Sequence, residues 1–297
     1  MNSSGDVHAF TNLGTARYIR RMIWQVTILV ILLAFLFHRI LVDLVAQWIR
    51  DPNYSHGFFV PLFCAWIVWR DRKRLLALSS RPNDWGLVII LGALGELVVG
   101  TLGAENFLSR TSLLFLLAGL VVYFFGWNSF RALLFPWAVM FLMVPLPAII
   151  FNQIALPLQF QASRLASGLL ALAGVPVLRQ GNIIQLPTIS LDVIDACSGL
   201  RSLVSLLALA VFYGYLFERR VLMRMVLIVA AVPIAVLANG VRIMGSGMLG
   251  EYWGPDKAEG FFHYFSGGAL FVVSLGLLIA LHAALSWIMR TAKARPA

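Results

Sequence analysis

Charged residues are scarce in this chain. Only 12% of its 297 residues are Asp, Glu, Lys or Arg, against about 25% in an average soluble domain, whereas 60% are hydrophobic. Long apolar stretches recur along the whole length, and the mean hydropathy is +0.86. This composition excludes a soluble globular domain and predicts an all-α polytopic membrane protein.

Cysteine is also rare, with two residues in the chain. Cys64 lies inside an apolar stretch and Cys197 at the edge of another, so a disulfide between them is not expected. We expect Cys64 to be a core residue. No spacing of metal-ligating residues is visible, and we expect neither a metal nor another cofactor.

The net charge of +10 does not indicate nucleic-acid binding, because the basic residues form short blocks beside apolar stretches. Such blocks mark the cytoplasmic ends of membrane helices, with lipids as the surroundings. The blocks predict that both termini are cytoplasmic and that the chain crosses the membrane about eight times. The predicted spans are residues 22–40, 58–69, 85–103, 111–126, 132–151, 200–217, 225–242 and 264–289.

These spans predict a single membrane domain over residues 22–290, with cytoplasmic tails at 1–21 and 291–297. Eight spans place all the basic blocks on the cytoplasmic side only if residues 154–175 do not cross the bilayer. The glutamines of this segment favour an amphipathic interfacial or re-entrant helix. Residues 175–186 then predict a small extracytoplasmic β-hairpin with its turn at 179–182, and 189–194 are partly strand-like. We place this insert at about 152–196, after Pro145 and Pro147, which kink or end span five.

The most polar stretch of the second half, residues 192–202, stands directly before span six. A thiol at the N-terminal end of a helix gains thiolate character from the helix dipole, and Arg201 acts in the same direction. Cys197 is therefore a candidate nucleophile, with Ser198 and Arg201 as supporting residues. The alternative is that Cys197 is a small buried apolar side chain, the commoner role of a single cysteine.

Two further polar residues fall at the same predicted surface, Arg242 at the end of span seven and His263 at the start of span eight. Together with Cys197 they meet the needs of acyl transfer: a nucleophile, a proton acceptor and donor, and a cation for the developing oxyanion. The alternatives are that Arg242 reaches the interface and complements a helix C-terminus, and that His263 is an ordinary interfacial histidine. Asn239 either supports the site or packs.

The chain resembles the exosortases, membrane-embedded sorting enzymes of Gram-negative bacteria that are counterparts of the archaeosortases. The resemblance covers about residues 20–290. It is carried by Tyr54-Ser55-His56-Gly57, Met143-Val144-Pro145-Leu146-Pro147, Gly174-Val175-Pro176-Val177, Gly181-Asn182, Asp195 to Ser202, Asn239-Gly240-Val241-Arg242 and His263 with Gly267.

This resemblance implies a sortase-like cysteine peptidase or transpeptidase with Cys197, Arg242 and His263 as its catalytic set. The implied substrates are proteins with a C-terminal signal of the PEP-CTERM type, namely a Pro-Glu-Pro motif, a membrane helix and a basic tail. Cleavage at the periplasmic face of the inner membrane, with transfer to an unknown acceptor, would be linked to exopolysaccharide and protein export.

Two other classes remain open: a transporter or assembly component of polysaccharide export, and a catalytically silent scaffold. A transporter should line a route through the mid-membrane with polar residues, whereas here the polar set gathers at one surface apart from Glu96. Loss of function on replacing Cys197 separates an enzyme from both. His56 is a further candidate for substrate binding or support, with a role in a turn as the alternative.

Overall fold

The computed structural model describes residues 4–193, 199–254 and 261–294, with side chains for 24–25, 27–193, 203–254 and 268–291. Each predicted span overlaps a helix, although several boundaries differ. These helices are α1 (Ser4–Arg50), α2 (Phe59–Arg70), α4 (Trp85–Leu102), α5 (Asn106–Phe125), α6 (Trp127–Met140), α9 (Gly199–Phe217), α10 (Val221–Trp253) and α12 (Phe261–Ala294).

Five of these helices, α1, α4, α5, α10 and α12, are long and apolar enough to cross a membrane, and a sixth span arises if α6 and the following α7 (Ala148–Leu172) count as one bent span. Helix α2 has 12 residues and is about 18 Å long, shorter than the roughly 30 Å hydrocarbon core. The protein is a multi-pass helical membrane protein, and the predicted count of eight is approximate.

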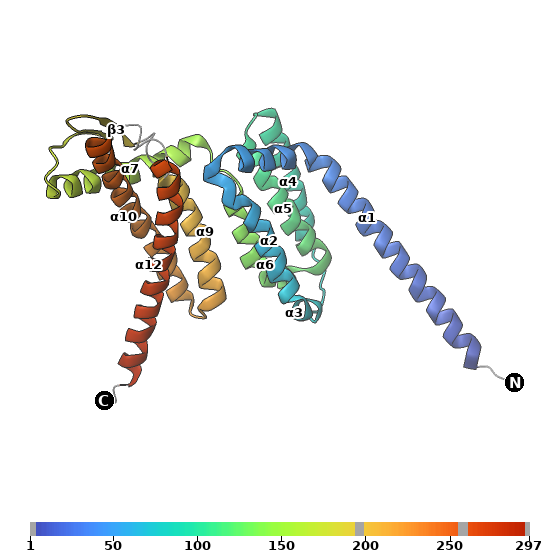
Figure 1. Cartoon of the computed structure of the whole chain (residues 1–297). Coiled ribbons are helices and arrows are strands. Elements are labelled where there is room, and N and C mark those ends of the chain that lie inside the picture. The colour runs from blue at the N-terminus through green and yellow to red at the C-terminus, as the bar shows by residue number, and fades with distance from the viewer. Residues whose placement is uncertain (1–3, 194–198, 255–260, 295–297) are drawn as a thin grey trace.

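The break between α6 and α7 lies where the prolines stand. A short 3-10 helix, η2 (Phe141–Met143), ends α6, and α7 then starts after Pro147 at an angle of 83° to the preceding helix. The predicted end of span five at residue 151 is therefore wrong, because Pro145 and Pro147 stop the helix earlier. Figure 1 shows α7 lying crosswise at the upper end of the C-terminal half of the molecule, as expected of an interfacial helix.

The insert after α7 is a three-stranded antiparallel sheet rather than a two-stranded hairpin. Strands β1 (Leu178–Gln180), β2 (Ile183–Gln185) and β3 (Ser190–Asp192) pair in that order. The turn is Gly181-Asn182, narrower than predicted, and Gly181 has a positive φ of 63°. The sheet packs on α7 and α10 through a buried cluster that includes Leu170, Ile184 and Ile243.

The helices divide the molecule into two ends. We call the end that holds His56, the start of α9 and the start of α12 the site end, and the end that holds Arg70 and the α9–α10 turn the basic end. Figure 1 shows α2, α9 and α12 descending side by side from the site end to the basic end, with the sheet at the site end beside α10.

Candidate functional site

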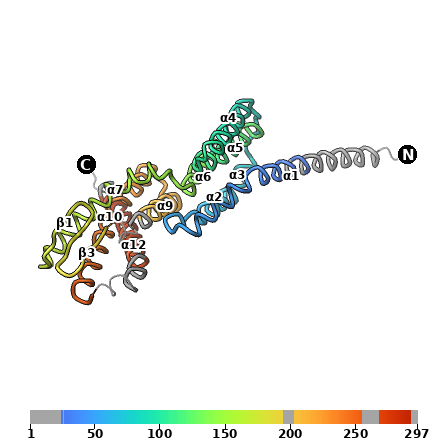
Figure 2. Tube along the Cα trace, turned by 90° about the horizontal axis from the view of Figure 1, so that it is seen from above, coloured from blue at the N-terminus to red at the C-terminus, as the bar shows by residue number. Residues whose placement is uncertain are grey.

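Helices α9, α10 and α12 form one packed bundle, in which each contacts the other two. Buried apolar residues join them, among them Leu206 of α9, Leu227 and Ala231 of α10, and Leu278 of α12. Figures 1 and 2 show the three lying together in the C-terminal half of the chain. The helices that carry or directly follow the three candidate catalytic residues are therefore neighbours.

Arg242 is buried within α10, with 4% of its surface exposed. Asn239 stands three residues earlier on the same face of the helix and is 9% exposed. Both residues have interaction partners. Between them Gly240 allows close approach of α7, since a Cβ there would overlap Leu165. Burial of a guanidinium is costly unless it is paired, so a position of this kind is either functional or part of a polar network.

One sequence-based alternative for Arg242 is wrong. Helix α10 does not end near residue 242 but continues to Trp253, so Arg242 cannot complement its C-terminus. The extension exists because Ile243 and Met244 pack against the sheet cluster, and because Glu251 accepts hydrogen bonds from the backbone N–H and hydroxyl of Thr188 at 3.1 and 2.8 Å. The sheet is thus fastened to the same helix that carries Arg242.

Four of the predicted site residues have no described side-chain geometry. Cys197 and Ser198 lie outside the described residues. Arg201 belongs to α9 and His263 to α12, but their side chains are outside the described part. Cys197 precedes the first residue of α9 by two positions, and His263 is the third residue of α12. Their predicted roles remain predictions.

His56 is buried in the short helix η1 (Pro52–Phe58), with 7% of its surface exposed. Its Nε2 lies 3.0 Å from the carbonyl oxygen of Leu142, and because a carbonyl only accepts, this nitrogen carries the proton in the neutral ring. Burial lowers the pKa of His56, and the carbonyls of Leu142 and Asn53 oppose the decrease. His56 is therefore held neutral, in one tautomer.

This contact joins the Tyr54–Gly57 motif to Leu142, the residue directly before the Met143–Pro147 motif, because η1 packs on η2. The Trp48 indole N–H donates to the carbonyl oxygen of Met143 at 2.9 Å. Gly57 lies against that indole ring, where a Cβ would overlap it. The motifs are 86 residues apart at the His56–Leu142 contact, and the fold makes them one unit at the site end.

A further buried arginine, Arg110, lies near the start of α5 and was not among the predicted site residues. It is 5% exposed and donates to Gln47 Oε1 of α1 at 2.7 Å. The run Ser109-Arg110-Thr111-Ser112 inside an apolar stretch was the signal that could have found it. Glu96 accepts a 2.6 Å hydrogen bond from Thr111. This bond gives Glu96, an acidic residue within a predicted span, a role in the packing of α4 on α5.

The predicted core role of Cys64 is confirmed: it is 5% exposed, and its thiol donates to the carbonyl oxygen of Pro136 at 3.2 Å. Within the described ranges no three His, Cys, Asp or Glu side chains converge to hold a metal ion. The chemistry that the described residues offer at the site end is thus a neutral imidazole, a buried guanidinium and neighbouring amides.

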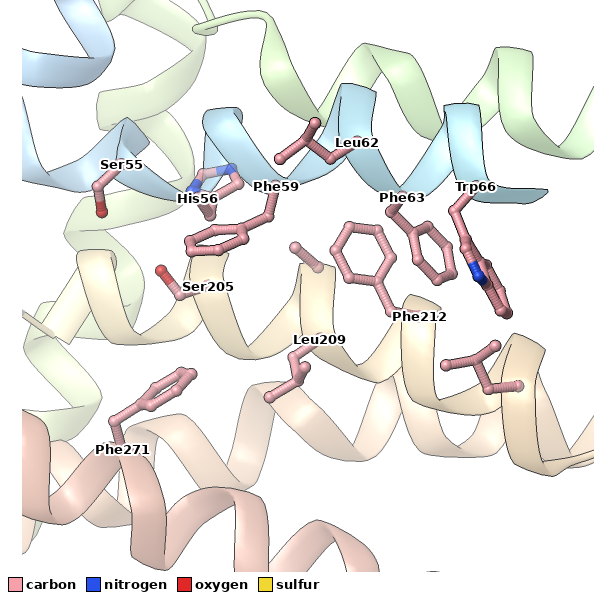
Figure 3. A pocket seen from close by; sticks show the side chains of 12 residues that line it. Ser55, His56, Phe59, Leu62, Phe63, Trp66, Ser205, Leu209, Phe212 and Phe271 are labelled. Atoms are coloured by element: carbon pink, nitrogen blue, oxygen red, sulfur yellow. The ribbon is translucent and has the colours of Figure 1, made fainter. Parts of the chain in front are cut away.

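An apolar groove runs between α2 and α9, with Phe271 of α12 at one side (Figure 3). It has a volume of about 730 Å³. Ser55, His56 and Ser205 line its site end, and Trp66 and Leu216 line the other end. The figure shows the rings of Phe59 and Phe63 from α2 facing α9 across it.

The family model of the transmembrane exosortases (Exosortase_EpsH) matches residues 48–280. Neither the curated proteins nor the solved structures include a significant match. The matched range contains η1, α2, the α6–α7 break, the sheet, α9, α10 and the first part of α12, and covers well over half of the chain. The chain therefore belongs to the transmembrane exosortase family.

Proposed function

We propose that the protein is a membrane-embedded cysteine peptidase or transpeptidase that cleaves C-terminal sorting signals of the PEP-CTERM type. The observation that carries the proposal is the packing of α9, α10 and α12 as one bundle in a chain of the exosortase family. Cys197 directly precedes α9, Arg242 lies in α10 and His263 opens α12. This order is what a single site built from three successive helices requires.

In this mechanism the Cys197 thiolate attacks the carbonyl carbon of the scissile peptide bond. The tetrahedral intermediate carries its negative charge on the carbonyl oxygen, which the Arg242 guanidinium stabilises. His263 accepts the thiol proton and delivers it to the leaving amine, leaving an acyl-enzyme thioester. Attack by water or by an acceptor nucleophile releases the product and restores the thiol.

The substrate's orientation follows from its own signal. The membrane helix enters the bilayer beside the bundle, which leaves the Pro-Glu-Pro segment at the site end, on the periplasmic side of a bacterial inner membrane. Both termini of the enzyme then lie in the cytoplasm, where the basic blocks are expected. Asn239, Arg201, Ser198 and His56 are the proposed supporting or substrate-binding residues.

The test is mass spectrometry of a sorting-signal protein co-expressed with the full chain. Wild-type enzyme should give a substrate shortened at its signal, with or without an attached acceptor. Cys197→Ala should leave the substrate intact while the enzyme reaches the membrane at normal levels. Cys64→Ser is the matched control, because it removes the other thiol and should leave processing in place. Processing that survives Cys197→Ala would exclude the cysteine mechanism and favour a transporter or scaffold.

A further inference from the structure

The groove between α2 and α9 ends, at the basic end, in a cluster of aromatic rings and arginines that the proposed chemistry does not use. Trp66 lines the groove, and the Arg70 guanidinium carbon lies 4.9 Å from the centre of its ring. Tyr215 lies beside Leu216 in sequence and accepts a 3.1 Å hydrogen bond from Arg70. Arg224, from α10, lies 5.2 Å from the centre of the Tyr215 ring.

This cluster exposes positive charge at the basic end of the bundle. Arg70 has 41% of its side chain exposed, and its one ion pair among the described residues is with Asp71 at 3.1 Å. Arg224 donates through Nε to the backbone carbonyl of Glu218 at 2.8 Å. Within the described part of the chain these contacts occupy two of the five N–H donors of Arg70 and one of the five of Arg224, so both retain donors for an anion.

The groove has the dimensions of one acyl chain. From Ser205 to Leu216 it follows α9 for about 16 Å, and half of the hydrocarbon core is about 15 Å. Its volume of about 730 Å³ falls in the range of small-molecule sites. A chain that starts at the basic end would run along the aromatic wall toward His56.

We infer that this groove is a binding site for an anionic phospholipid, with an acyl chain between α2 and α9 and the phosphate on Arg70 and Arg224. Basic pockets between membrane helices are known to hold anionic head groups, and guanidinium groups are suited to phosphate oxygens. Charge argues against the rival occupant, the membrane helix of a sorting signal. The basic tail of that signal would meet the arginines of the basic end.

The experiment uses the purified full chain in nanodiscs of phosphatidylcholine with increasing fractions of phosphatidylglycerol whose acyl chains carry bromine, a contact quencher of tryptophan. The fluorescence of Trp66 is obtained as the difference between wild type and Trp66→Phe. The fluorescence of Trp69, which is 61% exposed on the same helix, is obtained in the same way from Trp69→Phe. Quenching of Trp66 should saturate at a low phosphatidylglycerol fraction. Quenching of Trp69 should simply follow the bulk fraction.

Variants then identify the head-group contact. The double variant Arg70→Gln/Arg224→Gln should lower the apparent affinity for phosphatidylglycerol, measured by quenching of Trp66, by about 20-fold. The double variant Arg70→Lys/Arg224→Lys should retain most of this affinity. Arg290→Gln is the control, since Arg290 is an exposed basic residue on α12 outside the groove. Each variant is compared with itself in bromine-free lipid, which cancels the direct effect of Arg70 on the Trp66 ring.

Equal quenching of Trp66 by brominated phosphatidylcholine and phosphatidylglycerol would overturn the proposal, because the groove would then select no head group. Selective quenching that survives the double glutamine variant would equally overturn the assigned phosphate contact. Displacement of the brominated lipid by a synthetic sorting-signal helix, at a concentration that leaves Trp69 unaffected, would assign the groove to the substrate. None of these readings depends on peptidase activity.

Discussion

Two histidines stand at opposite ends of the membrane bundle and are held in different ways. At the site end His56 makes one hydrogen bond of good geometry, from Nε2 to a backbone carbonyl, and lines the groove. At the basic end His282 is paired on both ring nitrogens, with the Tyr213 hydroxyl at 2.8 Å and Glu218 Oε2 at 3.2 Å. The basic end is thus fastened by side chains from α9, the α9–α10 turn and α12, whereas the contacts of α1 and η1 with η2 at the site end rely on backbone carbonyls.

The difference predicts different effects of substitution at the two ends. The Tyr213–His282–Glu218 chain connects α9, the α9–α10 turn and α12, and its members hydrogen-bond one another. At the site end buried polar side chains come from several elements, among them His56 of η1, Arg110 of α5 and Arg242 of α10. We therefore expect the loss of Arg242 at the site end to change processing, whereas substitutions at the basic end should change stability or lipid binding.

The largest effect is expected for Arg242→Gln. If Arg242 stabilises an oxyanion, its loss should lower the rate of processing by about 100- to 1,000-fold, with a smaller effect of Arg242→Lys, which keeps the charge. The measurement is the rate of substrate cleavage in membranes, normalised to folded enzyme. An equal loss of folded protein and of activity would make Arg242 a packing residue instead.

Gly57→Ala should break the unit formed by the two motifs at the site end. The added Cβ would overlap the Trp48 ring, so we expect a loss of about 1–3 kcal/mol in the free energy of unfolding and a lower Tm. Gly92→Ala is the matched control, since nothing lies within 4 Å of a Cβ there. A Tm for Gly57→Ala as high as that of Gly92→Ala would show that the tight contact is not needed.

Glu218→Gln should test the basic end. Hydrogen bonds from the backbone N–H groups of Arg220 and Arg219 and from His282 lower the pKa of Glu218, although burial opposes this. A lowered carboxyl pKa contributes stability above its unfolded value of about 4.3 and loses it as the pH falls through the folded value. The variant should be about 1–2 kcal/mol less stable at pH 7 and show a flatter acid limb of Tm against pH, with processing unchanged. Lost processing at normal stability would contradict the division between the two ends.

The smallest effect is expected for His56→Gln. Because burial lowers the pKa of His56, the unfolded chain takes up a proton first as the pH falls below about 6.5, and stability decreases from there toward the folded pKa. The variant should remove this part of the pH dependence and cost about 0.5–1 kcal/mol at pH 7.5. An unchanged slope of Tm between pH 5 and 7 would show that His56 is not the titrating group.

Much of the fold could be predicted from hydropathy and proline placement, since each predicted span overlaps a helix. The misplaced boundaries have one cause: hydropathy does not distinguish apolar residues that face lipid from those that face protein. Helix α10 continues past Arg242 because the sheet covers Ile243 and Met244, and no local sequence pattern predicts this contact. The Gln47–Arg110 hydrogen bond could not be predicted either, because its partners are 63 residues apart in the sequence.

The sequence predicts that the candidate site residues lie at one surface, but it does not predict their contacts. Charge blocks and span parity predict that Arg242 and His263 share one surface, and the packing of α9, α10 and α12 makes the helices that carry them neighbours. The link from His56 to Leu142 depends on tertiary structure and could not be inferred from spacing. Motif positions alone therefore identified candidates without giving their partners.

The central claim is that Cys197 is an activated thiol served by His263 and Arg242, and the pH dependence of its alkylation tests this without any substrate. In a Cys64→Ser background, the rate of iodoacetamide modification of Cys197 should report a pKa well below the ordinary value of about 8.5. His263→Ala and Arg242→Gln should each shift it back upward. A titration at or above the ordinary value that neither substitution moves would contradict the account.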